Sequence, residues 1–250
     1  MIPKIIHYCW FGGNPLPPLA QKCIKSWKKY CPDYQIIEWN ESNFDVNCNA
    51  YCAAMYEQKK WAFLTDYVRL KVVYENGGVY MDTDVELLKP LDDLLNNKAY
   101  MGFETTGKVN TGLGFGAEKG HPFILENMTY YENLNDFKKV ETCPEITTRL
   151  LNEYGLKQDI QKNQVVYNVN ICPVDYFCPI EFETNIKRKT RRTYSVHHFV
   201  ASWHSKEQRK TVKKMQKRNR IDYYRLAPNR FMIRLLGVER YAKIKHFFGK

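Results

Sequence analysis

A glycine pair followed by a short apolar run and two carboxylates constrains this chain more than any other feature. Residues 77–84 read Gly-Gly-Val-Tyr-Met-Asp-Thr-Asp. The glycines predict the end of a helix and the apolar run predicts a strand, with Asp82 and Asp84 where that strand should end. Because side chains alternate along an extended chain, we expect both carboxylates on one face, a few ångströms apart.

Two carboxylates held on one face repel each other unless a cation lies between them. Mg2+ and Mn2+ favour oxygen ligands, and ligands of open α/β sheets bind at the carboxyl ends of strands. Asp82 and Asp84 are therefore candidate metal ligands. For an isolated match, a solvated Asp-x-Asp turn is the alternative interpretation.

The start of the chain predicts a strand–helix–strand unit. Residues 4–10 are nearly all apolar, as in a buried parallel strand, and residues 17–30 follow as a helix opened by two prolines. Residues 34–39 form the second predicted strand, which completes the opening of a nucleotide-binding type of half-sheet. Trp10, at the carboxyl end of the first strand, is either a core residue or a ring that stacks on a base.

A predicted helix over residues 60–75 carries Asp66 and Arg69 on a face that is otherwise apolar. One interpretation is a helical salt bridge, worth only about 0.2–0.5 kcal/mol. The other is that this face borders a site, where Arg69 reaches a phosphate and Asp66 accepts sugar hydroxyls. Asn110, ahead of the glycines of residues 108–117, is a candidate ligand contact or a simple turn residue.

Charge divides the chain into two parts. Residues 187–250 hold 20 Lys and Arg against 3 Asp and Glu, whereas the whole chain has a formal net charge of +11, so the remainder is acidic. Residues 206–226 predict a basic helix, a break follows at 227–229, and residues 230–250 set apolar side chains among basic ones. This second segment is typical of a helix that lies on an anionic bilayer, or of a helix packed on the domain with a solvated basic face.

Other features narrow the class of protein. The N-terminal residues are too quickly polar for a signal peptide, and no apolar run approaches ~18 residues. We therefore expect a protein that is neither secreted by that route nor membrane-spanning. The eight cysteines contain no Cys-x-x-Cys pair, which favours reduced thiols, several of them buried, over a disulfide framework or a zinc site.

Three ordered motifs resemble those of a known family. They are residues 2–13, the pattern Thr65-Asp66-x-x-Arg69, and residues 77–84. Together they look like the DXD-containing sugar transferases of glycosyltransferase family 32, which include bacterial polysaccharide enzymes and fungal mannosyltransferases. The large clostridial glucosylating toxins are similar more distantly. The resemblance covers most of residues 1–205 and implies an α/β GT-A fold, with a Rossmann-like, mostly parallel sheet that binds a nucleotide sugar.

The resemblance also implies roles for single residues. Trp10 would stack on the base, Asp66 would contact the ribose or donor sugar, and Arg69 would contact the sugar or pyrophosphate. Asp82 and Asp84 would hold Mn2+ or Mg2+, with Asp84 as the direct ligand. Asn110 matches a position that faces the donor sugar.

The C-terminal part of the resemblance is a His followed by Ser-Trp. Here it corresponds to His197 and Trp203, with His197 closing over the metal or diphosphate, Trp203 binding the donor, and His198 and His204 as rivals of His197. One departure concerns Cys143, because relatives commonly carry Gly before the following proline. We therefore leave the geometry of the acceptor-side loop open.

We accordingly expect residues 1–205 to form a catalytic domain and residues 206–250 a basic amphipathic helical tail. The predicted activity is a metal-dependent retaining transfer of a hexose or N-acetylhexosamine from a nucleotide sugar, with UDP favoured. The acceptor would be a saccharide or a lipid-linked oligosaccharide in capsular or other surface polysaccharide synthesis. The predicted location is the cytoplasmic face of the plasma membrane, with the tail on anionic lipid.

Two other classes remain as alternatives. A net charge of +17 over residues 187–250 is enough for a nucleic-acid-binding protein. The apolar residues of the tail and the acidic remainder argue against nucleic acid and for a membrane surface. A metal-dependent nucleotide hydrolase or nucleotidyltransferase would share the Asp pair but would not account for residues 10–13, Trp-Phe-Gly-Gly.

Overall fold

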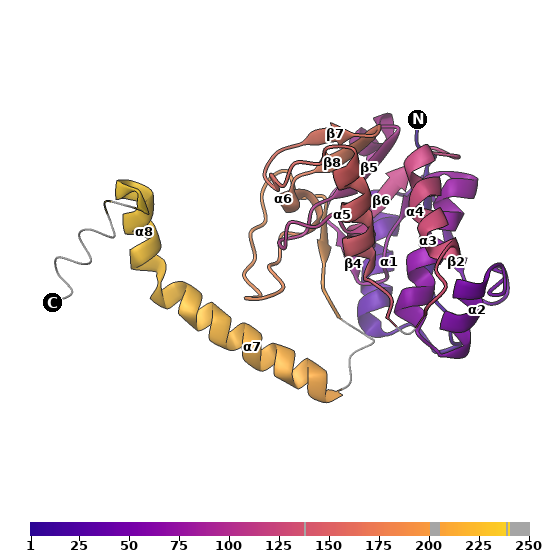
Figure 1. Ribbon diagram of the computed structural model, residues 1–250, viewed down its shortest axis with the longest axis horizontal. Coiled ribbons are helices and arrows are strands. Elements are labelled where there is room, and N and C mark those ends of the chain that lie inside the picture. The colour runs from indigo at the N-terminus through magenta and orange to yellow at the C-terminus, as the bar shows by residue number, and fades with distance from the viewer. Residues whose placement is uncertain (138, 201–205, 239, 241–250) are drawn as a thin grey trace. The chain divides into compact units, whose positions relative to one another are not determined.

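The structure, a computed structural model, describes residues 1–137, 139–200, 206–238 and 240, without the side chains of Lys206 and Arg209. The chain divides into two compact units. The first comprises Met1–Ile180 and Lys187–Trp203, and the second comprises Glu181–Ile186 and His204–Lys250. Strands β1 to β9 and helices α1 to α6 belong to the first unit, and helices α7 and α8 to the second (Figure 1).

The first unit begins with the expected strand–helix–strand motif. β1 (Ile5–Cys9) is almost wholly buried, and β2 (Gln35–Trp39) pairs with it in parallel. Between them, α1 (Pro18–Tyr30) begins with a proline, whose missing N–H costs nothing in the first turn of a helix. Trp27 on the buried face of α1 packs edge-on against Tyr8 of β1, with ring centroids 5.7 Å apart. The helix is thereby fixed against the sheet.

A seven-stranded sheet in the order β2-β1-β3-β6-β5-β8-β7 forms the core of the first unit. Strands β1, β2, β3, β5 and β8 run in one direction, and β6 and β7 in the other. The strands not yet given are β3 (Gly78–Tyr80), β5 (Ala99–Gly102), β6 (Phe115–Ala117), β7 (Gln164–Val166) and β8 (Val169–Cys172). The expected α/β class with a mostly parallel central sheet is confirmed.

Helices flank this sheet. α3 (Trp61–Asn76) packs on β1, β3 and β6, and α4 (Pro122–Glu132) packs on α3. α5 (Cys143–Glu153) contacts α4 and the short 3-10 helix η2 (Thr111–Leu113), which precedes β6. α3 therefore packs against both the sheet and α4.

Two glycines connect α3 to β3, as the sequence predicted. Gly77 has φ 68° and Gly78 has φ 106°, a region in which residues with a side chain are strained. A Cβ atom on Gly78 would also lie 2.8 Å from the carbonyl oxygen of Ile5. Glycine at this position therefore lets β3 come close to β1.

The acidic motif lies in a turn and not in the extended strand that the sequence predicted. β3 ends at Tyr80, and the N–H of Val85 donates to the carbonyl of Asp82 at 2.9 Å. The chain turns here because β3 and β4 (Val85–Leu87) belong to different sheets. The expectation that strand alternation would align the two carboxylates is therefore wrong in its geometry, although both still reach one site.

The second sheet of the first unit contains only β4 and β9 (Ser195–His197). The two strands are antiparallel, and Val85 lies opposite His197. This pairing brings a histidine from near the end of the first unit next to the acidic turn.

Four further elements complete the first unit. The helix α2 (Ala50–Glu57), capped by the Asn49 side chain, was not predicted. β7 and β8 form a hairpin with Tyr167 and Asn168 at positive φ in its turn. The 3-10 helix η1 (Asp92–Asn96) and the helix α6 (Val174–Phe177) are short.

The second unit contains α7 (Lys206–Arg225) and α8 (Ala227–Leu236). The break expected at residues 227–229 is at Leu226 instead, because proline is favoured in the first turn of a helix and Pro228 is the second residue of α8. Residues 241–250 of the predicted tail helix lie outside the described residues. Among those described, no helix has both the length and the apolar character needed to cross a membrane.

All eight cysteines are free, and all except Cys48 are buried. The expectation of reduced and mostly buried thiols is consistent with this arrangement.

Candidate active site

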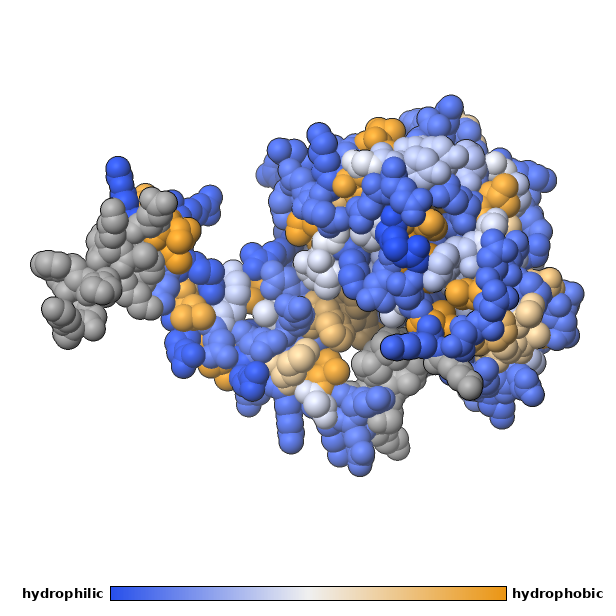
Figure 2. Space-filling model, viewed as in Figure 1, coloured by the Kyte–Doolittle hydropathy of each residue, from blue (hydrophilic) through white to orange (hydrophobic). Residues whose placement is uncertain are grey.

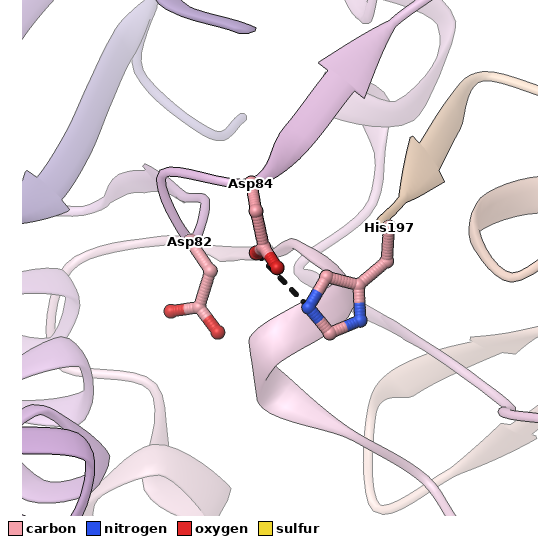
Figure 3. Close-up of side chains that lie close together, drawn as sticks. All are labelled: Asp82, Asp84 and His197. Atoms are coloured by element: carbon pink, nitrogen blue, oxygen red, sulfur yellow. Dashed lines mark ion pairs between the residues drawn. The ribbon is translucent and has the colours of Figure 1, made fainter. Parts of the chain in front are cut away.

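Asp82, Asp84 and His197 form a cluster where the two sheets meet. One potential ligand atom from each residue lies within 4.8 Å of the others. His197 Nε2 is 3.1 Å from Asp84 Oδ1, and Figure 3 shows this edge of the imidazole turned toward the Asp84 carboxylate. The two aspartates come from the turn between β3 and β4, and the histidine from β9. The cluster therefore depends on the pairing of β4 with β9.

Asp84 and His197 stabilise each other's charged forms. Burial alone would raise the pKa of Asp84, but His197 and the N–H of Val200, 2.9 Å from Oδ2, lower it to about 2. Burial would lower the pKa of His197, and the attraction of Asp84 outweighs burial and raises it. The backbone N–H of His198 also donates to the Asp84 carbonyl at 3.0 Å. Asp84 and His197 therefore form an ion pair when His197 is protonated.

Asp82 has a different partner, the buried guanidinium of Arg69. Arg69 Nη2 lies 3.2 Å from Asp82 Oδ1, and the Tyr80 hydroxyl donates to the same oxygen at 2.8 Å. Burial nevertheless raises the pKa of Asp82, with the Asp84 charge adding to the increase and Arg69 opposing it. The guanidinium also lies over the Tyr80 ring, 5.0 Å from its centroid. Asp82 is therefore held in place at an electrostatic cost.

Asp66, three residues before Arg69 on α3, is a second carboxylate that contacts the Arg69 guanidinium. Its Oδ1 lies 3.2 Å from Arg69 Nη2, so a single nitrogen of Arg69 bridges Asp66 and Asp82. Burial raises the pKa of Asp66 to about 6, against the opposing attraction of Arg69. The salt bridge interpretation of Asp66 and Arg69 is thus confirmed, and the contacts of these residues with a phosphate and with sugar hydroxyls stay predictions. Arg69 is 3% exposed, and its direct partner here is the acidic turn.

Asn110 borders the cluster from the opposite side. Its Oδ1 accepts the N–H of Gly112 at 2.6 Å and caps η2. A Cβ atom on Gly112 would lie 2.6 Å from Asp82 Oδ2 and 3.0 Å from Asn110 Oδ1. Asn110 therefore caps η2 and also lies close to the acidic turn, with Gly112 between Asn110 and Asp82.

Cys143, at the start of α5, joins these groups. Arg69 Nη1 donates to its sulfur at 3.5 Å, and the thiol donates to Asn110 Oδ1 at 3.7 Å. Burial raises the pKa of the thiol well above its usual range, so Cys143 acts here as a neutral donor. The position that departed from the family pattern thus contacts two predicted site residues.

The remaining predicted residues lie as follows. Trp10 follows the carboxyl end of β1, which is the parallel neighbour of β3, and its indole N–H donates to the Asn14 carbonyl. Trp10 and the acidic turn therefore lie at the same edge of the sheet. His198 points elsewhere and pairs with Glu86 at 2.9 Å, which leaves His197 as the histidine beside Asp84. Trp203 and His204 lie outside the described residues.

Sequence reasoning missed three residues of the site. Tyr80, two positions before Asp82, could have been found from the alternation of side chains along β3. Gly112 and Cys143 carried no comparable signal, because their proximity to Asp82 and Arg69 depends on the packing of η2 and α5 against α3.

The donor set fits a divalent cation. Two carboxylates supply the oxygen ligands that Mg2+ and Mn2+ favour, and a neutral imidazole is a common metal ligand. The Nδ1 atom of His197 is buried and has no hydrogen-bond partner within the described part of the chain, so Nε2 is the nitrogen that faces the carboxylates. Asp82, Asp84 and His197 are thus the residues that would hold the ion.

Part of this chain is similar to known glycosyltransferases. Residues 17–101 match a family model described as "Glycosyltransferase sugar-binding region containing DXD motif". Inositol phosphoceramide mannosyltransferase 3 of Schizosaccharomyces pombe is 32% identical over 130 residues, which cover 50% of this chain and 36% of the relative. Human alpha-1,4-N-acetylglucosaminyltransferase is 27% identical over 171 residues, covering 68% of this chain and 45% of the relative.

Among solved structures, the PaToxG glycosyltransferase has 18% sequence identity and a TM-score of 0.48, covering 61% of this chain and 68% of that one. This chain spans less than half the length of the two curated relatives above. The resemblance drawn from the motifs is confirmed over residues 17–101, which match this sugar-binding region and include Asp66, Arg69 and the Asp82-Thr83-Asp84 sequence.

Proposed function

We propose that the protein is a metal-dependent, retaining glycosyltransferase that moves a hexose or N-acetylhexosamine from a UDP-linked donor to a saccharide or lipid-linked acceptor. The observation that carries the proposal is the cluster of Asp82, Asp84 and His197, of which the two aspartates lie within the matched sugar-binding region. A divalent ion bound there would neutralise charge on a departing diphosphate.

The protein's own residues would divide the remaining work. Trp10 lies at the edge of the sheet where a base would stack, and Asn110 lies beside the acidic turn where the donor sugar would follow the diphosphate. Asp66 is buried beside Arg69 and would accept hydroxyl hydrogen bonds as a carboxylate. Arg69 would keep Asp82 in place for the ion. In a retaining reaction by same-face displacement, the acceptor proton would pass to the leaving phosphate.

The proposed metal and nucleotide can be tested together by thermal shift. Anything that binds only the folded protein raises its melting temperature. We expect a shift with UDP that requires Mn2+, exceeds the shifts with GDP and CMP, and disappears in Asp84→Ala. A Glu126→Ala variant, which removes a carboxylate bonded to the surface hydroxyl of Tyr154, is the matched control. The absence of a metal-dependent shift with all three nucleotides would contradict the proposal.

Retention of the anomeric configuration is tested on the reaction product. We expect an α-linked disaccharide from an α-linked UDP-sugar, identified by the anomeric proton coupling in NMR. A β-linked product would contradict same-face displacement while leaving the metal site intact.

The second unit supports a place for the enzyme at a membrane surface. On α8, Phe231 and Leu235 are four residues apart, hence on one face, and their exposed fractions are 66% and 67%. Arg230 and Arg234 lie beside them in the sequence, and Figure 2 shows hydrophobic and hydrophilic side chains side by side over α8. Exposed apolar residues interleaved with arginine favour an anionic phospholipid surface.

We propose peripheral attachment of this helix to the cytoplasmic face of the plasma membrane, close to a lipid-linked acceptor of surface polysaccharide synthesis. One relative is named for inositol phosphoceramide, which is a lipid acceptor class. The protein should sediment with vesicles that contain phosphatidylglycerol, less so at high salt, and not with pure phosphatidylcholine. Phe231→Glu with Leu235→Glu should abolish sedimentation. Equal binding of wild type and variant, or tighter binding to duplex DNA than to the vesicles, would contradict this attachment.

A further inference from the structure

Glu104 lies beside the candidate active site, although no role has been assigned to it above. It lies two residues after the end of β5 and begins a tight turn, in which its N–H donates to the Lys108 carbonyl at 2.8 Å. The N–H of Gly107 donates back to the Glu104 carbonyl at 3.0 Å, and Phe103 forms a bridge with Val109. This turn returns the chain so that Asn110 lies next to Glu104. The backbone thus fixes the position of the Glu104 side chain.

The Glu104 carboxylate is hydrogen-bonded to the Asn110 amide. Its Oε2 accepts from Asn110 Nδ2 at 3.0 Å, and its Oε1 accepts from the Thr106 hydroxyl. The other atom of the same amide, Asn110 Oδ1, faces Gly112 and, beyond it, Asp82. The Asn110 side chain therefore lies between Glu104 and the part of η2 that adjoins the acidic turn. The negative charge of Glu104 also contributes to the raised pKa of His197, which agrees with this placement.

A purely structural role accounts poorly for an acid at this position. The orientation of the Asn110 amide is already fixed by the Gly112 N–H and the Cys143 thiol. In the part of the chain that the structure describes, no Lys or Arg side chain forms an ion pair with Glu104, which is only partly buried. A further negative charge near Asp82 and Asp84 raises the electrostatic cost of the site. A neutral glutamine would support the same turn without this cost.

The unused acceptor capacity of Glu104 suggests what it binds. An ionised carboxylate offers about four lone-pair positions, and Thr106 and Asn110 use two of them. Hydroxyl groups are donors of the type that a partly exposed carboxylate binds well, and Asn110 beside it is an amide that can both donate and accept. A carboxylate next to an amide is thus a suitable pair for two neighbouring sugar hydroxyls.

We propose that Glu104, together with Asn110, binds a sugar hydroxyl at this site and thereby contributes to the choice of sugar. This inference rests on the proposed glycosyltransferase function and deepens it. Glu104 accepts a hydrogen bond from the hydroxyl, and Asn110 holds the carboxylate in position. The hydroxyl belongs to the donor sugar or to the acceptor sugar, which the experiment distinguishes.

The test is Glu104→Gln, which keeps the size of the side chain and its ability to accept from Asn110 but removes the charge and one strong acceptor. Binding of UDP with Mn2+ reports the nucleotide and metal sites without any sugar, and we expect it to be unchanged. Binding and hydrolysis of the UDP-sugar should weaken about tenfold if the hydroxyl belongs to the donor. If it belongs to the acceptor, the KM for the acceptor should rise by about the same factor while donor hydrolysis is unchanged.

Two controls make the result decisive. Glu126→Gln removes an equivalent charge from the outer side of α4, where the carboxylate bonds to Tyr154, and should change none of these quantities. The double variant Glu104→Gln with Asn110→Ala should lose no more than Asn110→Ala alone, because the two residues act as a pair.

The proposal is overturned if Glu104→Gln leaves sugar binding and transfer at the wild-type level. It is also overturned if UDP and UDP-sugar binding weaken by the same factor, because Glu104 would then act only through the metal site. Failure of the wild-type protein to bind UDP with Mn2+ would instead contradict the proposed function itself.

Discussion

The two aspartates of the acidic turn have the same chemistry and lie two positions apart, but their surroundings act on them in opposite directions. Asp84 pairs with His197 and a backbone N–H, and its pKa is lowered to about 2. Asp82 is partly buried against Arg69, and its pKa is raised. The charge of Asp84 therefore stabilises the fold, whereas the charge of Asp82 costs stability. A motif that reads as symmetric in the sequence is asymmetric in the structure.

Removing Arg69 should have the largest effect, because it leaves the buried Asp66 and the partly buried Asp82 without their shared cation. We expect Arg69→Ala to lower the free energy of unfolding by about 3–5 kcal/mol, measured by urea denaturation. The matched control is Arg149→Ala, which breaks a surface ion pair with Glu141 in which both side chains are nearly half exposed, and should cost less than about 1 kcal/mol. Equal effects of the two variants would mean that the Asp82 half is not held by Arg69.

Replacing each aspartate of the turn by asparagine tests the asymmetry directly. The lowered pKa of Asp84 means that its stabilisation is present above about pH 4, its unfolded value, and is lost as pH falls through about 2. At pH 7, Asp84→Asn should therefore cost about 2 kcal/mol. The raised pKa of Asp82 has the opposite sign, because its charged form is less stable in the fold, so Asp82→Asn should be neutral or stabilising.

Both asparagine variants should lose the Mn2+-dependent thermal shift, since each removes a proposed ligand. The two variants should therefore differ in their free energy of unfolding but not in their loss of metal binding. The comparison fails if Asp82→Asn and Asp84→Asn change the free energy of unfolding by the same amount.

Gly112→Ala should lower catalytic activity while leaving the protein folded. The new methyl group would lie 2.6 Å from Asp82 Oδ2, so the carboxylate or η2 must shift. We expect kcat/KM to fall about tenfold, with far-UV circular dichroism unchanged, as overpacking usually costs about 1–3 kcal/mol. Unchanged activity would show that Asp82 can move freely, and that Arg69 does not fix its position.

The smallest expected effect concerns Asp66 and pH. Its pKa is raised to about 6 in the fold, so the folded protein binds this proton more tightly, and the resulting stabilisation at low pH is lost as pH rises through about 6. Between pH 5 and pH 7.5 this should remove about 1 kcal/mol, a loss that Asp66→Asn should not show. If the free energy of unfolding of the wild type and of Asp66→Asn fell equally between pH 5 and pH 7.5, the titrating group would not be Asp66.

Local patterns predicted much of this arrangement. The helical spacing of Asp66 and Arg69, the glycine pair before β3 and the strand–helix–strand start all depend on neighbouring residues, and all were found in the sequence. The turn at Asp82 was not, because it arises where the chain leaves one sheet for another. The contacts of Gly112 and Cys143 with the acidic turn and Arg69 were also missed. They depend on how distant helices pack, for which a single sequence carries no periodic signal.

The pairing of β4 with β9 has a consequence for how the site opens and closes. It joins two strands of only three residues each, and His197 lies at one end of it. So short a ladder can open locally without global unfolding, and opening would separate His197 from Asp84. A cation held by both strands would oppose that opening. Amide hydrogens of residues 85–87 and 195–197 should then exchange with solvent deuterium more slowly when Mn2+ is added, which would make the ladder a reporter of occupancy.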